Sequence, residues 1–332
     1  MPRTFSIVAL ALFTLISFAP SASAQTKKKI IFIAGPQSHE FGGHEHNAGC
    51  DLLAKALNET MADKIETKVY HNGWPNEAGA LDGADAIVMY CDGGNGHMAI
   101  AHLSEIDALA KKGVGIGCIH YAVEPGEGKA EPNGRAEFLR WIGGYFEAYW
   151  SINPHWKADV TSIPAHPVGS GVKPFSTNDE WYYHMRFREN MEGVTPIVAA
   201  VPPDNTRKGK DDAHGGNPEV RKGIGKSIPE ITVWVSENTD PAYNGQRGFG
   251  CTGAHVHWNW AQDDFRKTIL NACVWIAKVD VPAGGVESKR PTVQDLLANM
   301  DKKQRPADKT DEWIAKYIEQ VNQPMPARQA AK

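Results

Sequence analysis

The sequence lacks any cysteine pair at the spacing of a metal or redox motif. Its five cysteines, an odd number, lie far apart in the chain, at Cys50, Cys91, Cys118, Cys251 and Cys273. This spacing excludes CxxC-type zinc and thioredoxin-like sites. Several of the cysteines fall inside apolar runs, so we expect buried free thiols rather than a disulfide framework.

A strong excess of one charge is also absent. The formal net charge is −4 over 332 residues, which argues against a nucleic-acid-binding protein. The only basic run near the N-terminus, at 27–29, is typical of a solvated leader segment. We also find no internal repeat, which excludes the solenoid and propeller architectures.

Long apolar runs are missing except at the N-terminus. There Arg3 precedes an apolar run over 7–19, and small residues follow at 22–24. This pattern predicts a secretory signal peptide over 1–24, cleaved after Ala24. A membrane anchor is the weaker alternative, because the run is short for a span of about 20 residues. We therefore expect a periplasmic or secreted protein with no membrane span after cleavage.

The remaining chain alternates short apolar runs with segments of helical period. The first half predicts strands over 29–35, 67–70, 85–91 and 113–119, with helices over 47–60 and 99–112. The second half predicts a helix over 134–144, strands over 157–161, 194–201, 231–235 and 248–253, and a helix over 264–277. Alternating strands and helices predict an α/β fold with a mostly parallel, doubly wound sheet. We expect one mixed sheet to hold all the strands.

The domain layout follows from the same reading. Residues 25–280 are expected to form the main domain. Within it, the segment 202–229 is dense in Lys, Asp, Gly and Pro, which predicts a long mobile insertion. Residues 281–332 contain two amphipathic stretches, over 293–300 and 313–321, and are expected to form a peripheral helical tail.

Histidine is present where a site is expected. Most of the thirteen histidines follow apolar runs that predict strands, and open α/β sheets bind their ligands at that edge. The densest group is the loop HEFGGHEH over 39–46, which does not have the spacing of an H-E-x-x-H zinc motif. We expect His39 and His44 to bind substrate there, with surface contacts and helix capping as the alternative.

The strand over 113–119 ends at His120, so that side chain should enter the crevice above the sheet. We expect His120 to act as a general acid or base. The alternative is a core histidine bonded to a backbone partner. Cys118 lies two residues deeper in the strand and is not expected to be a nucleophile.

The segment DEWYYH over 179–184 places carboxylates beside aromatic rings, a combination that suits sugar recognition. We expect Glu180 to be catalytic. The substrate-binding residues predicted in this part of the chain are His166, Asp179, Trp181 and Tyr182. The alternative for the tryptophans is a place in the core.

His255 and His257 form a His-x-His pair near the end of a predicted strand. Strand alternation places both rings on one face. Such a pair, with His44 or His39 as a third ligand, is suited to a divalent metal such as Zn²⁺ or Mn²⁺. A hydrogen-bonded histidine cluster is the alternative explanation of the same residues.

Together these motifs make the chain similar to the ThuA-like (trehalose-utilisation) family, whose fold is that of class I glutamine amidotransferases. The similarity runs from about residue 28 to residue 279. It rests on the first strand with its histidine loop, the segment from Gly117 to Ala122, the pair His166-Pro167 with Asp179-Glu180, and Arg247-x-Phe249 leading to His255.

The resemblance implies a flavodoxin-like, amidotransferase-like sheet flanked by helices. It also implies the absence of glutaminase activity, because His120 stands where amidotransferases carry their nucleophilic cysteine. Two departures from the family pattern are Tyr121 and Ala254, each where the family usually has glycine. Both are expected to crowd the pocket, and Tyr121 is therefore counted among the substrate-binding residues.

The leading hypothesis is an exported enzyme that acts on a glycoside or keto-sugar derivative by hydrolysis, elimination or isomerisation. In it His120, Glu180 and His255 are catalytic, and His39, His44 and His255 serve as oxyanion-binding or metal-binding groups. Two alternatives stay open: a non-catalytic carbohydrate-binding protein, and a metal-dependent hydrolase with His44, His255 and His257 as ligands. The expected partner is a small sugar, and a homo-oligomer is compatible with the sequence.

Overall fold

The computed structural model describes residues 1–2, 26–127 and 133–325. All but the first two residues of the predicted signal peptide, and the end of the predicted tail, lie outside this part of the chain. Within the described residues, every helix is too short or too polar to cross a membrane.

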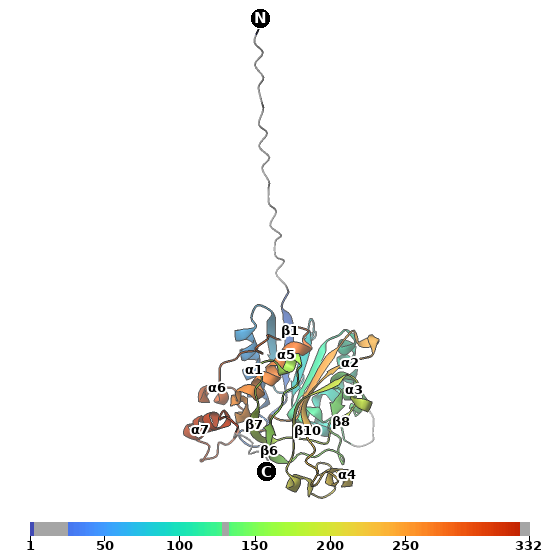
Figure 1. Cartoon of the computed structure of the whole chain (residues 1–332), viewed down its shortest axis with the longest axis vertical. Coiled ribbons are helices and arrows are strands. Elements are labelled where there is room, and N and C mark those ends of the chain that lie inside the picture. The colour runs from blue at the N-terminus through green and yellow to red at the C-terminus, as the bar shows by residue number, and fades with distance from the viewer. Residues whose placement is uncertain (3–25, 128–132, 326–332) are drawn as a thin grey trace.

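A seven-stranded sheet forms the centre of the molecule (Figure 1), in the order β2-β1-β3-β4-β11-β10-β9. The strands are β1 (Lys28–Ala34), β2 (Ile65–Tyr70), β3 (Ala86–Tyr90), β4 (Gly115–Ile119), β9 (Val194–Ala200), β10 (Glu230–Glu237) and β11 (Arg247–Cys251). The strands from β2 to β11 in this order are parallel. β10 runs antiparallel to both of its neighbours. The predicted mostly parallel sheet is confirmed.

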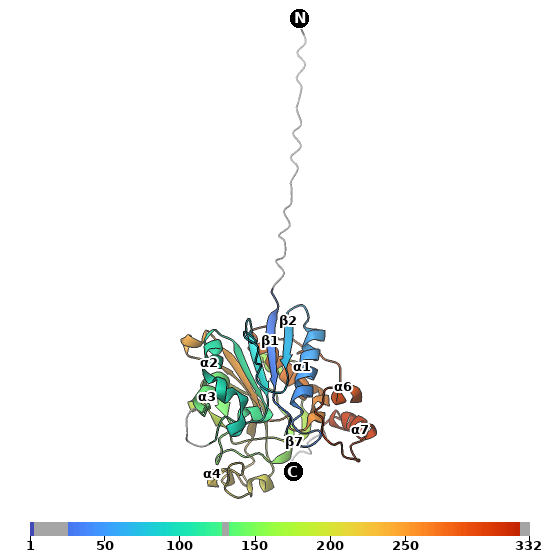
Figure 2. The same ribbon diagram turned by 180° about the vertical axis from the view of Figure 1, so that it is seen from behind.

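Helices cover both faces of the sheet (Figures 1 and 2). One face carries α1 (His46–Thr60) and α5 (Asp263–Ile276), and the other carries α2 (Leu103–Lys111) and α3 (Arg135–Ile142). Successive residues of β1 alternate between the two cores: Ile30 packs on the first face and Ile31 on the second. Because both faces of β1 are buried, its residues do not alternate between apolar and polar, which explains the continuous apolar run in the sequence.

The topology decides where a ligand can bind. β1 pairs with β2 on one side and with β3 on the other, so the direction in which the sheet grows reverses between β1 and β3. In doubly wound sheets, ligands bind outside the carboxyl ends of the strands at such a point. The loops that follow β1, β3, β4 and β11 all open at this edge.

A second, two-stranded antiparallel sheet pairs β6 (His155–Val160) with β7 (Phe175–Glu180). The expectation that one sheet holds all strands is therefore wrong, because the strand predicted over 157–161 lies in this smaller sheet. Sequence analysis missed β7. Every second residue of β7 is buried, as in other strands, but two of these buried residues, Thr177 and Asp179, are polar. The sequence of β7 therefore shows no alternation of apolar and polar residues. A third small sheet pairs β5 (Gly144–Tyr145) with β8 (Arg186–Phe187).

Several shorter elements complete the described fold. The 3₁₀ helices are η1 (Gly94–Gly96), η2 (Met98–His102), η3 (His120–Val123), η4 (Pro167–Gly169), η5 (Glu189–Met191), η6 (Asp204–Arg207), η7 (Pro241–Tyr243) and η8 (His257–Ala261). The segment 202–229 contains η6 and the short helix α4 (Pro218–Arg221). Buried Arg207 in this segment forms an ion pair with Glu230 at 2.7 Å. The mobility of the segment stays a prediction.

The tail forms α6 (Val293–Leu297) and α7 (Asp311–Val321), close to the two helices that the sequence predicts there. α6 contacts α1, and α7 contacts η8. Between them, the buried Lys303 ammonium donates to the Gly43 carbonyl at 2.6 Å and pairs with Glu45 at 3.2 Å. The tail is therefore fastened to the loop that follows β1.

Candidate functional site

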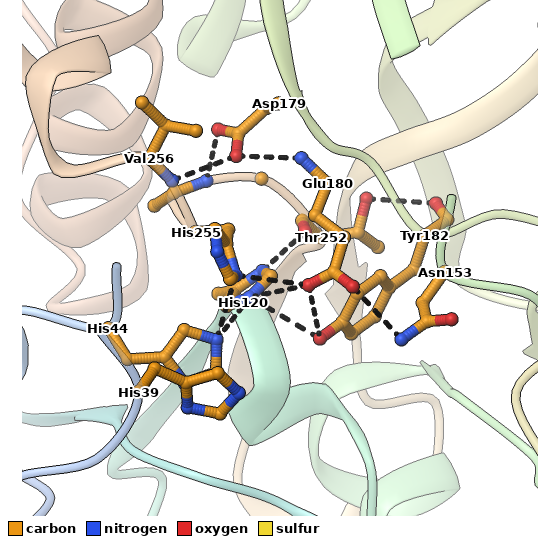
Figure 3. Close-up of polar contacts among 12 residues, drawn as sticks. His39, His44, His120, Asn153, Asp179, Glu180, Tyr182, Thr252, His255 and Val256 are labelled. Atoms are coloured by element: carbon orange, nitrogen blue, oxygen red, sulfur yellow. Dashed lines mark hydrogen bonds and ion pairs between the residues drawn. The ribbon is translucent and has the colours of Figure 1, made fainter. Parts of the chain in front are cut away.

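Three histidines from three different loops meet at the carboxyl edge of the sheet (Figure 3). His44 follows β1, His120 follows β4 and His255 follows β11. The His44 Nε2 atom lies 3.0 Å from His120 Nε2 and 3.0 Å from His255 Nδ1. All three side chains are buried. The structure thus brings together three histidines that lie far apart in the sequence.

Glu180, at the end of β7, faces these rings. Its Oε2 atom lies 3.1 Å from His255 Nδ1 and 3.4 Å from His120 Nε2. The Tyr182 hydroxyl lies 3.3 Å from His120 Nε2 and 3.4 Å from the same carboxylate oxygen. The Asn153 amide donates to the other oxygen, Oε1, at 3.0 Å. Glu180 is therefore held by hydrogen bonds with one oxygen toward the histidines. We call His44, His120, Glu180 and His255 the histidine cluster.

Two of the rings are oriented through their Nδ1 atoms. His44 Nδ1 donates to the Asp92 carboxylate at 2.6 Å, and His120 Nδ1 donates to the Thr252 carbonyl at 2.9 Å. Because both acceptors are oxygens without a proton, the Nδ1 atoms carry the hydrogens. In the neutral rings each Nε2 atom then carries a lone pair.

Burial and neighbouring charges shift the pKa values of the cluster residues and of Asp92. Burial raises the pKa of Asp92, but hydrogen bonding to and the charge of His44 outweigh it, and the net pKa is lowered. Glu180 behaves in the same way, because His120 and His255 outweigh the effect of burial on its pKa. Burial lowers the pKa of His44 more than Asp92 raises it. For His255, burial lowers the pKa, but contact with Glu180 raises it by a larger amount, so the net pKa is increased.

The arrangement leaves two lone pairs facing each other. His44 Nε2 and His120 Nε2 are 3.0 Å apart, and neutral rings at that distance repel unless a cation lies between them. One donor atom from each cluster residue lies within 4.8 Å of the others. Around one ion with bonds of about 2.1 Å, ligands stand about 3.0 Å apart at right angles and about 3.4 Å at the tetrahedral angle. The measured contacts of the cluster fit these spacings.

His39 stands at the rim of the cluster, as the sequence predicts. Its ring stacks on His44 with 3.5 Å between centroids, and its Nδ1 atom lies 3.1 Å from the Ser38 hydroxyl. Its side chain is 38% exposed. Burial is the largest influence on its pKa and lowers it. His39 is therefore the histidine of this site that combines a neutral ring with access to solvent.

Several residues of the site have a strained backbone. His44 has φ 47°, His120 has φ 56° and Ala254 has φ 83°, in the left-handed region that costs a residue with a side chain about 1–2 kcal/mol. At Ala254, the resemblance to the family leads us to expect glycine. Surrounding bonds hold this residue in place: Tyr90 donates to its carbonyl at 2.5 Å, and its amide donates to Asp179 at 2.7 Å.

Asp179 and Tyr121 support the site in different ways. The buried Asp179 carboxylate accepts from the amides of Ala254 and Val256, at 2.7 and 3.0 Å. It therefore positions the loop that carries His255, and its carboxylate is occupied by these backbone amides. The Tyr121 ring centroid lies 6.0 Å from that of His44, so Tyr121 forms part of the wall beside the cluster.

Three predicted site residues do not reach the cluster. His257 begins η8 and its Nε2 atom bonds to the Leu296 carbonyl at 2.8 Å, because β11 ends at Cys251 and strand alternation stops before the His-x-His pair. His166 accepts from the Val168 amide and caps η4. Trp181 is fully buried and donates to the Thr177 carbonyl. The metal role for His257 and the substrate contacts for His166 and Trp181 are therefore wrong.

Sequence reasoning missed three groups that orient the cluster. Asp92 is the first charged residue after β3, so the rule that located His120 at the end of β4 also applies to it. Asn153 and the Thr252 carbonyl carry no comparable signal. The expectation for the cysteines is confirmed: all five are free and buried. Burial raises the pKa of Cys118, which leaves it unsuited to act as a thiolate.

Fold and site together define an α/β protein whose mostly parallel sheet carries a polar site at its carboxyl edge. The family model ThuA, described as trehalose utilisation, matches residues 36–276, and the chain belongs to this family.

Solved structures share the fold at low sequence identity. A ThuA-like protein from Bacteroides uniformis is 15% identical, with a TM-score of 0.51 over 81% of this chain and 99% of that one. One from Parabacteroides merdae is 12% identical, with a TM-score of 0.48 over 84% and 100%. PurLQS from Thermotoga maritima is 12% identical, with a TM-score of 0.37 over 76% and 97%. The two lower scores add nothing to the fold assignment. No curated protein matches the sequence.

Proposed function

We propose that this protein is a metal-dependent enzyme that acts on a sugar derivative, and that the histidine cluster holds a divalent cation, Zn²⁺ or Mn²⁺. The observation that carries the proposal is the approach of His44 Nε2 and His120 Nε2, whose Nδ1–H groups are both committed to oxygen acceptors. Imidazole and carboxylate ligands with such oriented partners are typical of sites for these ions.

Two observations support a sugar substrate. The matched family is described by trehalose utilisation. Beside the cluster stand the Tyr182 hydroxyl, the Asn153 amide and the exposed Glu40 carboxylate, groups that bind sugar hydroxyls. A periplasmic or secreted location is also part of this proposal, and it rests on the signal peptide that the sequence predicts over 1–24.

The proposed mechanism divides the work among the residues of the chain. A divalent cation at the cluster would supply a Lewis acid for a carbonyl or hydroxyl oxygen of the sugar. Metal binding would occupy His120 Nε2 and so replace the acid–base role that the sequence predicts for it. His39, neutral and accessible at the rim, then accepts a proton from the substrate. Burial raises the pKa of Tyr182, so its hydroxyl stays protonated and donates a hydrogen bond.

These roles suit proton abstraction next to a keto group, as in elimination or isomerisation of a keto-sugar, and also hydrolysis. Glutaminase activity is not expected, because the turn after β4 presents His120 in place of a thiol.

Metal analysis of the purified protein tests the first half of the proposal. We expect one equivalent of Zn²⁺ or Mn²⁺ per chain, removal by a chelator, and recovery in a titration followed by calorimetry. Failure to bind either ion would contradict the proposal. It would leave a hydrogen-bonded histidine cluster that shares a proton, and the acid–base role of His120 would return.

A thermal-shift panel of sugars and 3-keto-sugars, with product analysis of every stabilising compound, tests the second half. We expect turnover by the metal-loaded protein and its loss in His39→Ala. Stabilisation without turnover would instead indicate a carbohydrate-binding protein.

A further inference from the structure

The tail contributes a wall to a cavity beside the histidine cluster. Residues 281–325 lie beyond the region that matches the family, which ends at residue 276. The cavity has a volume of about 270 Å³ and lies between the loop after β1 and helix α7. His255 lines it as well as belonging to the cluster, so the cavity adjoins the cluster at this side chain.

Four aromatic side chains line this cavity. We call it the aromatic trough, after the side chains Phe41, Trp258, Trp313 and Tyr317 that line it. Neighbouring rings are in contact: the centroids of Phe41 and Trp258 are 5.7 Å apart, those of Trp258 and Trp313 are 6.0 Å apart, and Trp313 stacks on Tyr317 at 5.4 Å. Two of the four rings therefore come from α7.

Polar groups stand around these rings. Glu40, His155, Asn178 and Lys309 also line the trough. The Lys309 ammonium lies 3.9 Å from the centre of the Trp313 ring, and Glu40 Oε1 lies 3.7 Å from His255 Nε2. Aromatic faces beside carboxylate, amide and ammonium groups match a sugar ring, which has apolar faces and a rim of hydroxyls.

We infer that the aromatic trough binds the second sugar ring of a glycoside whose first ring lies at the histidine cluster. The placement of the first ring rests on the proposed function. The bond between the two rings would pass beside His255 and Glu40, where the aromatic trough meets the cluster. The substrate is then a disaccharide or longer glycoside rather than a single sugar.

Removing one ring of the tail tests the inference. Calorimetry with trehalose, maltose and glucose is performed on the full-length wild type, Trp313→Ala and Trp313→Phe. Wild type should bind at least one disaccharide about tenfold more tightly than glucose, as expected for an additional stacked ring. Trp313→Ala should lose this preference, and Trp313→Phe, which keeps a ring, should retain most of it.

The matched control is Trp74→Ala. Trp74 is also partly buried and stacks on another side chain, His102, at 4.2 Å, but it does not line the trough. The Trp74→Ala variant should bind the sugars with the affinity of wild type. Equal binding of disaccharides and glucose by wild type, or an unchanged preference in Trp313→Ala, would overturn the inference.

The same titrations on metal-stripped protein separate this inference from the proposed function. If the protein binds no metal but still shows a disaccharide preference that depends on Trp313, the trough stands and only the metal-dependent function fails. If metal and turnover are present without that preference, the enzyme stands and the trough has no role in binding.

Discussion

The buried histidines form two sets that share residue type and burial but differ in their partners. In the histidine cluster, ring nitrogens face one another and Glu180. Elsewhere, buried histidines bind backbone groups: His97 Nε2 contacts the Ala122 carbonyl at 3.0 Å while its Nδ1 atom accepts from the Ala99 amide at 3.0 Å, and His257 Nε2 contacts the Leu296 carbonyl. Convergence of ligand atoms on one point, rather than burial, therefore distinguishes a site from a structural bond.

The largest expected effect comes from removing a cluster ring. His120→Ala should weaken Zn²⁺ binding by more than the roughly 100-fold that loss of an outer-shell partner can cause, because it deletes a ligand. Calorimetry on chelator-treated protein measures this, with circular dichroism to check the fold. If His120→Ala bound Zn²⁺ as tightly as wild type, the histidines of the cluster would not differ in metal binding from those that bind backbone groups.

Asp92→Asn tests the orientation of a ring rather than its presence. We expect a 10–100-fold loss of metal affinity, since the amide no longer fixes the Nδ1–H tautomer of His44 as a carboxylate does. The control is Asp51→Asn, because Asp51 also contacts a histidine, His71, at 2.9 Å, but outside the cluster. A loss of equal size in the control would point to a general effect of charge.

His97→Ala tests the second set, the buried histidines that bind backbone groups. It leaves the Ala99 amide and the Ala122 carbonyl without these partners. The free energy of unfolding should therefore fall by about 2–6 kcal/mol, at about 1–3 kcal/mol for each unpaired buried group. Urea denaturation measures the loss, and metal affinity should not change. A parallel loss of metal binding would show that His97 belongs functionally with the cluster.

The same residue makes the fold sensitive to acid. Burial lowers the pKa of His97 to about 4, whereas in the unfolded chain it is about 6.5. Below pH 6.5 the unfolded chain takes up a proton that the folded one does not. Stability is therefore lost as the pH falls from 6.5 toward 4, by at most about 3 kcal/mol from this group. The difference in stability between wild type and His97→Ala should shrink over this range, and a constant difference would contradict the assignment.

The smallest effect concerns the backbone beside His255. Ala254→Gly should raise the free energy of unfolding by about 1 kcal/mol, because glycine adopts φ 83° without strain. Ala122→Gly serves as the control, since Ala122 is equally buried but does not have a positive φ, and it should be destabilising. No gain at position 254 would mean that the loop tolerates the strain at no cost.

Sequence reasoning recovered the elements that depend on apolar periodicity. β1, β3 and β4 are buried on both faces and appear as apolar runs, and the order of strands and helices then dictates the parallel sheet. β7 escaped because its inward side chains include Thr177 and Asp179. Asp179 is buried there because its carboxylate accepts from the amides of Ala254 and Val256, more than 70 residues further along the chain, and only the folded chain brings these groups together.

Sequence reasoning selected His44, His120 and His255 because they follow predicted strands, and it selected Glu180 because carboxylates stand beside aromatic residues at 179–184. The prediction for His257 failed because it extended strand alternation past the end of β11. The Thr252 carbonyl and the Asn153 amide were out of reach, since a backbone group has no sequence signature and an isolated asparagine in a loop has little.

The bond between Lys303 and the Gly43 carbonyl joins positions 260 residues apart in the chain. During synthesis, the loop that carries His44 emerges among the first residues of the domain, and its anchor emerges near the end. All the strands of the sheet lie before α5 in the chain, but this loop stays without its anchor until the tail has been made. A chain that stops before residue 300 should therefore contain every strand of the sheet and every residue of the histidine cluster, but hold the loop that carries His44 less firmly.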